Sequence, residues 1–236
     1  MKREFNANGL EYVYDEYSDA YQVVGCGNCG EEILQISQNY NEKPVLGIGD
    51  FAFQNCKKIM GVAFGEQLRF IGESAFNFCE NLEKIRTPFA LTNIEKYTFY
   101  GCKNLQRVEL GENLRQINEN AFGDCVSLTE VLFPSSLLRI GRRAFYNCTR
   151  LTKIHMPPSL KIIEEGAFYN CENLTQVTFN SELTSIGKFA FGDCVNIQTL
   201  VFNGTIQQWR AVQKGEGWHR GIPAKKIICQ DGEEKL

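Results

Sequence analysis

Apolar residues recur along this chain in a pattern that repeats every 23 residues. Each repeat contains the motif Ala-Phe-x-x-Cys, with Thr98 in place of the alanine in one repeat, followed by mostly apolar residues three, six, eight, twelve and fifteen positions after the cysteine. A fixed period in the twenties predicts a solenoid of stacked, equivalent coils. The cysteines that mark this register are seven of the ten in the chain, namely Cys56, Cys79, Cys102, Cys125, Cys148, Cys171 and Cys194.

The pattern inside one repeat predicts its local structure. Apolar and polar residues alternate around Val108 and Leu110, as they do in a half-buried strand. A later Leu-x-x-Ile segment predicts a second, shorter extended piece, and Ala-Phe-x-x-Cys predicts one helical turn because its end members share a face. One coil cannot bury its own apolar side, whereas stacked coils share a continuous core. Thr87 is the clearest exception to the repeat, because it is a polar residue at a position that is apolar in the other repeats. We therefore expect an α/β fold leaning to mostly β.

The repeat resembles the BspA-like leucine-rich repeat family. The resemblance rests on the motif Ala-Phe-x-x-Cys-x-x-Leu-x-x-Ile-x-Leu-Pro-x-x-Leu-x-x-Ile-Gly, which is clearest from Ala144 to Pro157. It implies a right-handed leucine-rich repeat solenoid with a curved parallel sheet, short helical turns on its convex side, and a cap at each end. Many members of this family are surface proteins of bacteria and some protists, and some act as adhesins.

Both ends of the chain predict caps, which an open solenoid needs to cover its terminal apolar faces. Residues 12–14 and 21–24 predict a hairpin around an acidic turn, while Ile206, Trp209 and Val212 share one helical face suited to a lid. We expect one domain over 1–236. It would comprise an N-terminal hairpin cap over 1–44, seven 23-residue repeats over 45–206 and a C-terminal cap over 207–236.

Composition narrows the possible functions and locations. Lys and Arg total 25 against 28 Asp and Glu, and this balance of −3 gives no support to nucleic-acid binding. No apolar run approaches the ~18 residues of a membrane span, and the residues after Met1 lack the apolar stretch of a signal peptide. The resemblance implies a bacterial cell-surface or secreted protein. The missing signal and the many thiols leave a cytoplasmic interaction scaffold as the alternative.

Three cysteines lie outside the repeat, Cys26, Cys29 and Cys229, and they raise the possibility of a metal site, a redox pair or a nucleotide-binding loop. The segment Gly25-Cys26-Gly27-Asn28-Cys29-Gly30 contains both a Cys-x-x-Cys pair and the Gly-x-Gly-x-x-Gly pattern of a dinucleotide-binding loop. Such a loop needs a helix next, but the following residues predict an extended segment. A zinc site would need two further ligands, and Cys229 is the only other cysteine outside the ladder. A hairpin turn or local disulfide is the favoured reading, and a metal or redox pair is the alternative.

The outward face of the predicted strands is the candidate binding site. Leucine-rich solenoids bind on their concave sheet, which is an analogy from the fold alone. The outward positions fall five and seven residues after each cysteine, and we predict partner contacts at Lys84, Arg86, Arg107, Glu109, Glu130, Lys153 and His155. An electrostatically selective protein surface is one interpretation, and a face charged only for solubility is the other. Loop aromatics form a second candidate patch, Tyr97, Tyr100, Tyr146, Tyr169 and Phe189.

No pattern in the chain predicts catalysis. His155 and His219 are the only histidines, and neither has a Ser or Cys nucleophile at a recognisable spacing. We therefore predict a non-catalytic protein-protein interaction module, adhesin-like, that uses no cofactor and no metal. An enzyme or metal protein that uses Cys26, Cys29 and one histidine is the competing hypothesis.

Overall fold

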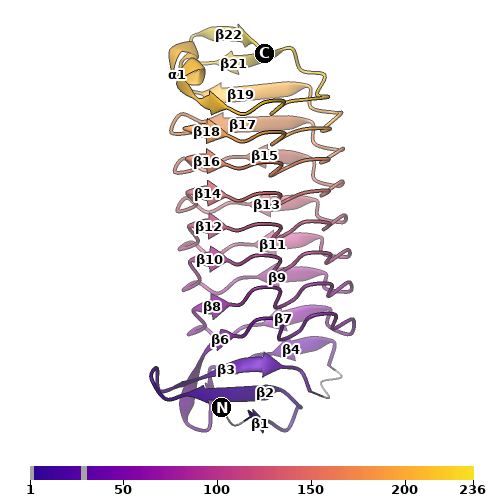
Figure 1. Ribbon diagram of the computed structural model, residues 1–236, viewed down its shortest axis with the longest axis vertical. Helices are drawn as coiled ribbons and strands as arrows, with labels where there is room; N and C mark the ends of the chain where they lie inside the picture. Colours follow the sequence, from indigo (N-terminus) through magenta and orange to yellow (C-terminus); the bar gives the residue numbers. More distant parts are fainter. Residues whose placement is uncertain (1–2, 28–30) are drawn as a thin grey trace.

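The computed structural model describes residues 3–27 and 31–236, which form a tall column of stacked coils (Figure 1). The first strand of each coil faces one side of the column, and these strands form what we call the first sheet. They are β7 (Gly61–Ala63), β9 (Lys84–Arg86), β11 (Arg107–Glu109), β13 (Glu130–Leu132), β15 (Lys153–His155), β17 (Gln176–Asn180) and β19 (Thr199–Asn203). They pair in parallel, hydrogen-bonded in the orders β13-β11-β9-β7 and β15-β17-β19.

The second strand of each coil has two residues and belongs to the opposite side of the column. These strands are β8 (Phe70–Ile71), β10 (Asn93–Ile94), β12 (Gln116–Ile117), β14 (Arg139–Ile140), β16 (Ile162–Ile163), β18 (Ser185–Ile186) and β20 (Gln213–Lys214). Six of these strands form a second parallel sheet in the order β10-β12-β14-β16-β18-β20. Paired residues of consecutive repeats are 23 positions apart in both sheets, for example Ile117 with Ile140, whereas pairings next to the caps span 27 or 28, as for Ser185 with Gln213. The constant register therefore superposes equivalent side chains from coil to coil.

The segment Ala-Phe-x-x-Cys folds as tight turns, and here the structure departs from the predicted helical turn. Tyr146 N–H donates to the Arg143 carbonyl and Cys148 N–H to the Phe145 carbonyl, so these bonds span three residues rather than the four of an α-helix. Arg143 and Asn147 have φ angles of 51° and 58°, in the left-handed region. The apolar spacing of these turns equals that of one helical turn, which explains the difference.

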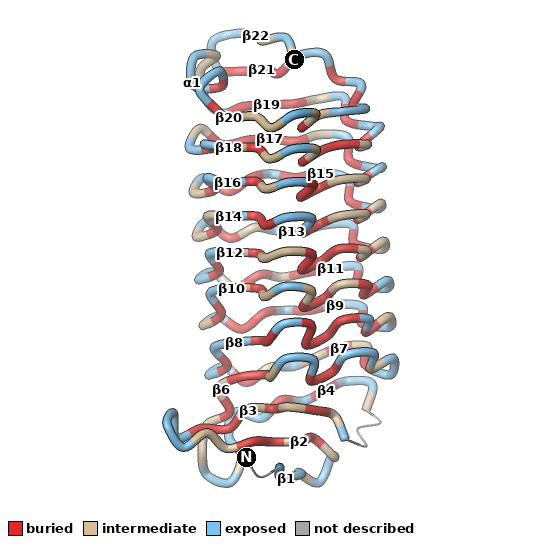
Figure 2. The backbone as a smooth tube through the Cα atoms, in the orientation of Figure 1, coloured by how far each residue is buried: buried red, intermediate tan, exposed pale blue. Residues whose placement is uncertain are grey.

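Two ladders of buried side chains run along the column, and Figure 2 colours the buried parts of each coil red. The phenylalanines of the motif, from Phe53 to Phe191, are stacked with neighbouring ring centroids 5.1 to 5.5 Å apart. The cysteines from Cys79 to Cys194 are fully buried. Each donates its Sγ–H to the carbonyl oxygen of a phenylalanine 26 residues earlier, at 3.0 to 3.3 Å. These thiols behave as small apolar side chains with a satisfied weak donor.

A cap covers each end of the core. At the N-terminal end, β1 (Arg3–Phe5), β2 (Glu11–Asp15) and β3 (Ala20–Gly25) pair antiparallel, which confirms the predicted hairpin. The strands that connect this cap to the coils are β4 (Ile33–Gln35), β5 (Asn39–Tyr40) and β6 (Lys43–Ile48). β3 pairs with β6 and β4 pairs with β7, both in parallel.

At the C-terminal end, the predicted lid is α1 (Ile206–Ala211), the only helix in the part of the chain that the structure describes. Thr205 and Gln208 form a capping box at its start, and Trp209 is buried against Phe202, with ring centroids 5.3 Å apart. The last two strands, β21 (Lys226–Cys229) and β22 (Gly232–Lys235), close the first sheet. Among the described residues, no helix is long and apolar enough to cross a membrane.

Candidate protein-binding face

The predicted contact residues lie together on the outward side of the first sheet, which we call the strand face. Lys84 and Arg86 belong to β9, Arg107 and Glu109 to β11, Glu130 to β13, and Lys153 and His155 to β15. Lys84, Arg107 and Glu130 follow one another in register across three strands. All seven side chains are exposed except Glu109, which is half-buried. The short alternating strands place them there because each central residue, such as Val108, points into the core.

Lys84, Arg86 and Arg107 form a basic cluster on the strand face, and Glu109 lies among them and changes the electrostatics of the cluster. Its carboxylate is 3.3 Å from a guanidinium nitrogen of Arg107 and 3.9 Å from one of Arg86. Both arginines are largely exposed, so these ion pairs contribute little to stability. Lys84 forms no ion pair with any residue that the structure describes. The cluster thus keeps a net positive charge, with one carboxylate that orients two guanidinium groups.

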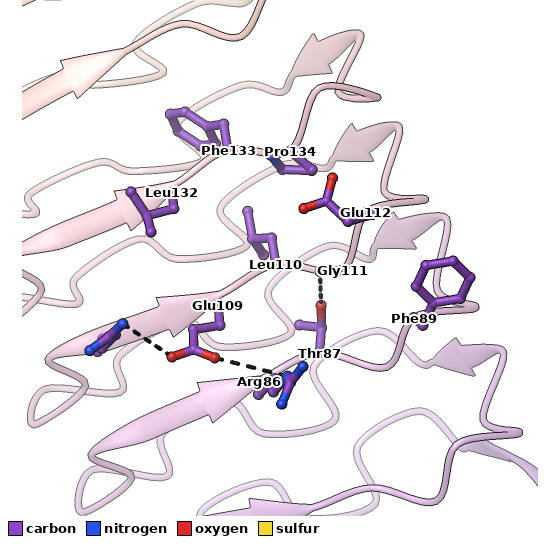
Figure 3. Close-up of a pocket in the computed structure, with 11 residues that line it drawn as sticks. Arg86, Thr87, Phe89, Glu109, Leu110, Gly111, Glu112, Leu132, Phe133 and Pro134 are labelled. Carbon is purple, nitrogen blue, oxygen red and sulfur yellow. Dashed lines mark hydrogen bonds and ion pairs between the residues drawn. The ribbon is translucent and has the colours of Figure 1, made fainter.

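A hollow of about 430 Å³ opens beside this cluster, between the loops that follow β9, β11 and β13 (Figure 3). Arg86 and Glu109 line one side of it, and Leu132 and Phe133 line another. Phe89 projects at its rim with 67% of its surface exposed. The hollow therefore combines two arginines with exposed apolar side chains, a composition typical of protein-binding surfaces.

The hollow lies where the repeat departs from its pattern at Thr87. Equivalent positions in other coils carry a larger apolar residue, such as Leu110 or Phe133. Thr87 is buried, and its hydroxyl accepts a hydrogen bond of 2.8 Å from the Gly111 N–H. The small polar side chain holds the next loop in place without filling the volume that Leu or Phe would fill. Sequence reasoning recognised Thr87 as a lapse, but it did not include Thr87, Phe89 or Leu132 in the site.

The second candidate patch contains two pairs of packed aromatic residues on the turn side of the column. Tyr97 and Tyr100 pack edge to face with centroids 5.7 Å apart, while Tyr146 and Tyr169 stack at 5.8 Å. The Tyr100 hydroxyl donates to Asp124, and this bond, together with partial burial and nearby charge, raises the pKa of Tyr100 to about 12. The Tyr169 hydroxyl is engaged by Asp193 in the same way. Because these hydroxyls already have partners, the tyrosines serve first to fix neighbouring turns.

The residues of the competing hypothesis are not assembled into a site in the described part of the chain. His155 is exposed on β15, whereas His219 lies in the C-terminal cap beside Trp218, where burial lowers its pKa. Cys29, with Asn28 and Gly30, lies outside the described residues. The strand β4, rather than a helix, follows this segment, so the dinucleotide-loop pattern lacks its structural context. Within residues 3–27 and 31–236, no group of three or more His, Cys, Asp or Glu side chains could hold a metal ion.

A column of parallel coils, each with a short strand, a constant register and a shared apolar ladder, defines a leucine-rich repeat protein. The sequence profile described as "BspA type Leucine rich repeat region (6 copies)" matches residues 32–152 and 138–211. This match spans most of the chain, which therefore belongs to the BspA-type leucine-rich repeat family. A comparison with curated protein sequences finds no match.

Several solved structures share the fold. A leucine-rich repeat protein from T. pallidum is 26% identical, with a TM-score of 0.64 over 92% of this chain and 88% of that one. A leucine-rich repeat protein from Bacteroides ovatus is 23% identical, with a TM-score of 0.65 over 97% of this chain and 71% of that one. The pneumococcal vaccine antigen PcpA is 16% identical, with a TM-score of 0.50 over 97% of this chain and 81% of that one. These similarities place the architecture among bacterial leucine-rich repeat proteins.

Proposed function

We propose that the chain is a non-catalytic protein-binding module that engages its partner through the strand face of β9, β11 and β13. The observation that carries this proposal is the hollow beside the basic cluster, where exposed charge and exposed apolar surface coincide. Family membership supports the class of function, because repeat solenoids present an extended surface to their partners. We further propose an adhesin-like role at a bacterial cell surface or after secretion.

The hollow indicates the chemistry of the partner. Two guanidinium groups share one carboxylate, so a second carboxylate can pair with Arg86 or Arg107 without displacing Glu109. Phe89 and Leu132 are the apolar side chains left uncovered at the same place. A protein segment that presents an acidic residue beside an apolar one complements both features. Charge complementarity of this kind raises association rates and selectivity more than affinity.

The proposal is tested by binding measurements with a charge-reversed variant. The triple variant Lys84→Glu, Arg86→Glu, Arg107→Glu is compared with the unmodified protein on immobilised extracellular-matrix and mucin proteins, with circular dichroism to verify folding. Loss of binding in this variant, and weaker binding of the unmodified protein at higher salt, are the expected results.

A matched control carries the same change of charge away from the strand face. Arg150, Lys188 and Lys225 are exposed and lie outside the strands of the first sheet, so their reversal to Glu should leave binding intact. Equal loss in both triple variants would show that net charge alone governs binding, which contradicts a site on the strand face. Absence of binding to every matrix and mucin protein would contradict the adhesin role, and capture of a cytoplasmic partner through the same residues would favour the scaffold alternative.

A further inference from the structure

Two sulfur atoms lie close together where the N-terminal cap meets the first repeat. Cys26 follows directly after β3, and Cys56 is the first cysteine of the ladder. Their Sγ atoms are 3.0 Å apart. A disulfide bond is about 2.05 Å long, so a displacement of roughly 1 Å separates this contact from a covalent bond. The sequence suggested a local disulfide within Cys26-x-x-Cys29, whereas the fold brings Cys26 to a residue thirty positions away.

The setting of Cys56 differs from that of the six cysteines that follow it. Each of those six is fully buried and donates its thiol hydrogen to a backbone carbonyl oxygen of an earlier coil. Burial raises the pKa of Cys79 to about 12, which suppresses the nucleophilic thiolate form. Cys56 and Cys26 are only half-buried, and each has the other's sulfur as a neighbour. The ladder therefore begins with a pair of thiols in contact, in reach of solvent.

We propose that Cys26 and Cys56 form an oxidisable dithiol, which a disulfide-containing oxidant converts to a bond between the cap and the first coil. The thiolate of one cysteine attacks a sulfur of the oxidant and releases the first small thiol, which leaves a mixed disulfide on the protein. The second cysteine then attacks the protein sulfur of that mixed disulfide and releases the second small thiol. The protein loses two hydrogens and two electrons, and the oxidant gains both.

The position of this bond determines its effect on the molecule. The cap is held to the coils by the parallel pairing of β3 with β6, and the Gly49 N–H donates to the Val23 carbonyl at 2.7 Å. A Cys26–Cys56 bond adds a covalent connection just beyond the end of β3, across the segment that contains β4, β5 and β6. A crosslink of this kind limits how far the cap can open, because its two ends can no longer separate. Oxidation would thus fix the cap onto the column while leaving the central coils unchanged.

Peptide mapping of the full chain tests the bond directly. The protein is incubated with excess oxidised glutathione, its remaining thiols are blocked with N-ethylmaleimide under denaturing conditions, and it is cleaved after glutamate without reduction. This cleavage separates residues 17–31, which contain Cys26 and Cys29, from residues 43–66, which contain Cys56. The expected product is these two peptides joined, with the ladder cysteines from Cys79 to Cys194 alkylated.

Two single variants identify the cysteine that forms the bond. Cys29→Ser should keep the linked peptides, and Cys26→Ser should lose them. A bond between Cys26 and Cys29, a link that survives only in Cys26→Ser, or unmodified thiols after oxidation would each overturn the proposal. Circular dichroism of both variants verifies that they are folded.

Amide hydrogen exchange tests the effect on the cap. Oxidation should slow exchange in β2 and β3 by at least tenfold, while exchange in β11 and β12 should stay the same. The Cys26→Ser variant, treated with the same oxidant, provides the control and should show no slowing. Equal exchange in the reduced and oxidised protein would overturn the proposed fixation of the cap.

Discussion

The buried ladders and the strand face belong to the same coils. The ladders need the same residue type in every coil, whereas the strand face carries different residue types at equivalent positions. From Phe76 to Phe191 the ladder places a phenylalanine in every coil, and neighbouring rings stack at nearly constant spacing. On the strand face, by contrast, Lys84, Arg107 and Glu130 occupy equivalent positions with different charges. Repetition inside the column thus provides stability, and variation outside provides a surface that can discriminate between partners.

The hollow shows where these two regions meet. Thr87 belongs to an inward column, yet its small polar side chain leaves space that opens onto the strand face. One departure from the interior pattern therefore coincides with a hollow at the strand face. The comparison can be tested by changes that act on one region and leave the other unaffected.

The largest expected effect comes from alkaline pH, through the buried thiols of the ladder. Burial raises the folded-state pKa above 9.0 for five ladder thiols, Cys79, Cys102, Cys125, Cys148 and Cys171. Below pH 9 these thiols are protonated in both states, so they make no difference. Above pH 9 the unfolded chain loses protons that the folded chain retains, and each thiol then lowers the free energy of unfolding by about 1.4 kcal/mol per pH unit.

Urea unfolding between pH 8 and 10.5, monitored by circular dichroism under reducing conditions, measures this loss. The midpoint should fall steeply above pH 9, and a variant with Cys102→Ala and Cys125→Ala should show a shallower fall because two of the five thiols are gone. A midpoint that stays constant up to pH 10.5 would contradict the assignment of buried, protonated thiols to the ladder.

The next effect compares one large side chain from each region. Phe122 is fully buried and stacks on Phe99 and Phe145 with centroids 5.3 Å away. Phe122→Ala should lower the free energy of unfolding by about 3–5 kcal/mol, since it removes buried apolar surface and leaves a cavity. Leu132→Ala on the strand face, where 58% of the leucine is exposed, should change it by less than about 0.5 kcal/mol. Similar losses in both variants, measured by urea unfolding, would contradict the division into two regions.

The repeat, its strands and both caps could be predicted because they depend on apolar periodicity. The N-terminal hairpin and the helix of Trp209 were found in the same way, since one alternates with period two and the other shares a helical face. The tight turns of the Ala-Phe-x-x-Cys segments were not predicted, because their apolar residues have the same spacing as those of a helical turn. Asn and Asp at positions such as Asp124, Asn147 and Asn170 carried the missing signal, as these residues tolerate left-handed backbone.

The candidate site was predictable only in part, for a related reason. The positions of the charged residues on the strand face can be predicted from their spacing alone. The constant period even places Glu109 opposite Arg86 in the adjacent strand. The hollow depends instead on the volume that Thr87 leaves unfilled, and spacing does not measure volume. The contact of Cys26 with Cys56 depends on how the cap docks, which the repeat does not specify.

A smaller effect tests the turns that separate the two regions. Arg143 is exposed and has a φ of 51°, so a β-branched residue at this position would be strained. Arg143→Val should lower the free energy of unfolding by about 1–2 kcal/mol, whereas Arg143→Gly, which favours this backbone, should leave it nearly unchanged. Thermal unfolding of both variants is the measurement. Equal destabilisation by Val and Gly would show that the side chain of Arg143, and not its backbone conformation, matters for stability.

A small effect on stability is expected at Glu109, and it separates a binding face from a structural one. The ion pairs of Glu109 with Arg86 and Arg107 are exposed, so Glu109→Gln should change the free energy of unfolding by no more than about 1 kcal/mol. The same substitution releases both guanidinium groups and raises the positive charge of the face, so association with an acidic partner should become faster and more sensitive to salt. Urea unfolding and binding kinetics at two salt concentrations measure the two effects separately. If Glu109→Gln instead destabilised the fold strongly and left binding kinetics unchanged, the cluster would belong with the ladder as part of the scaffold, and the partner would have to contact the column elsewhere.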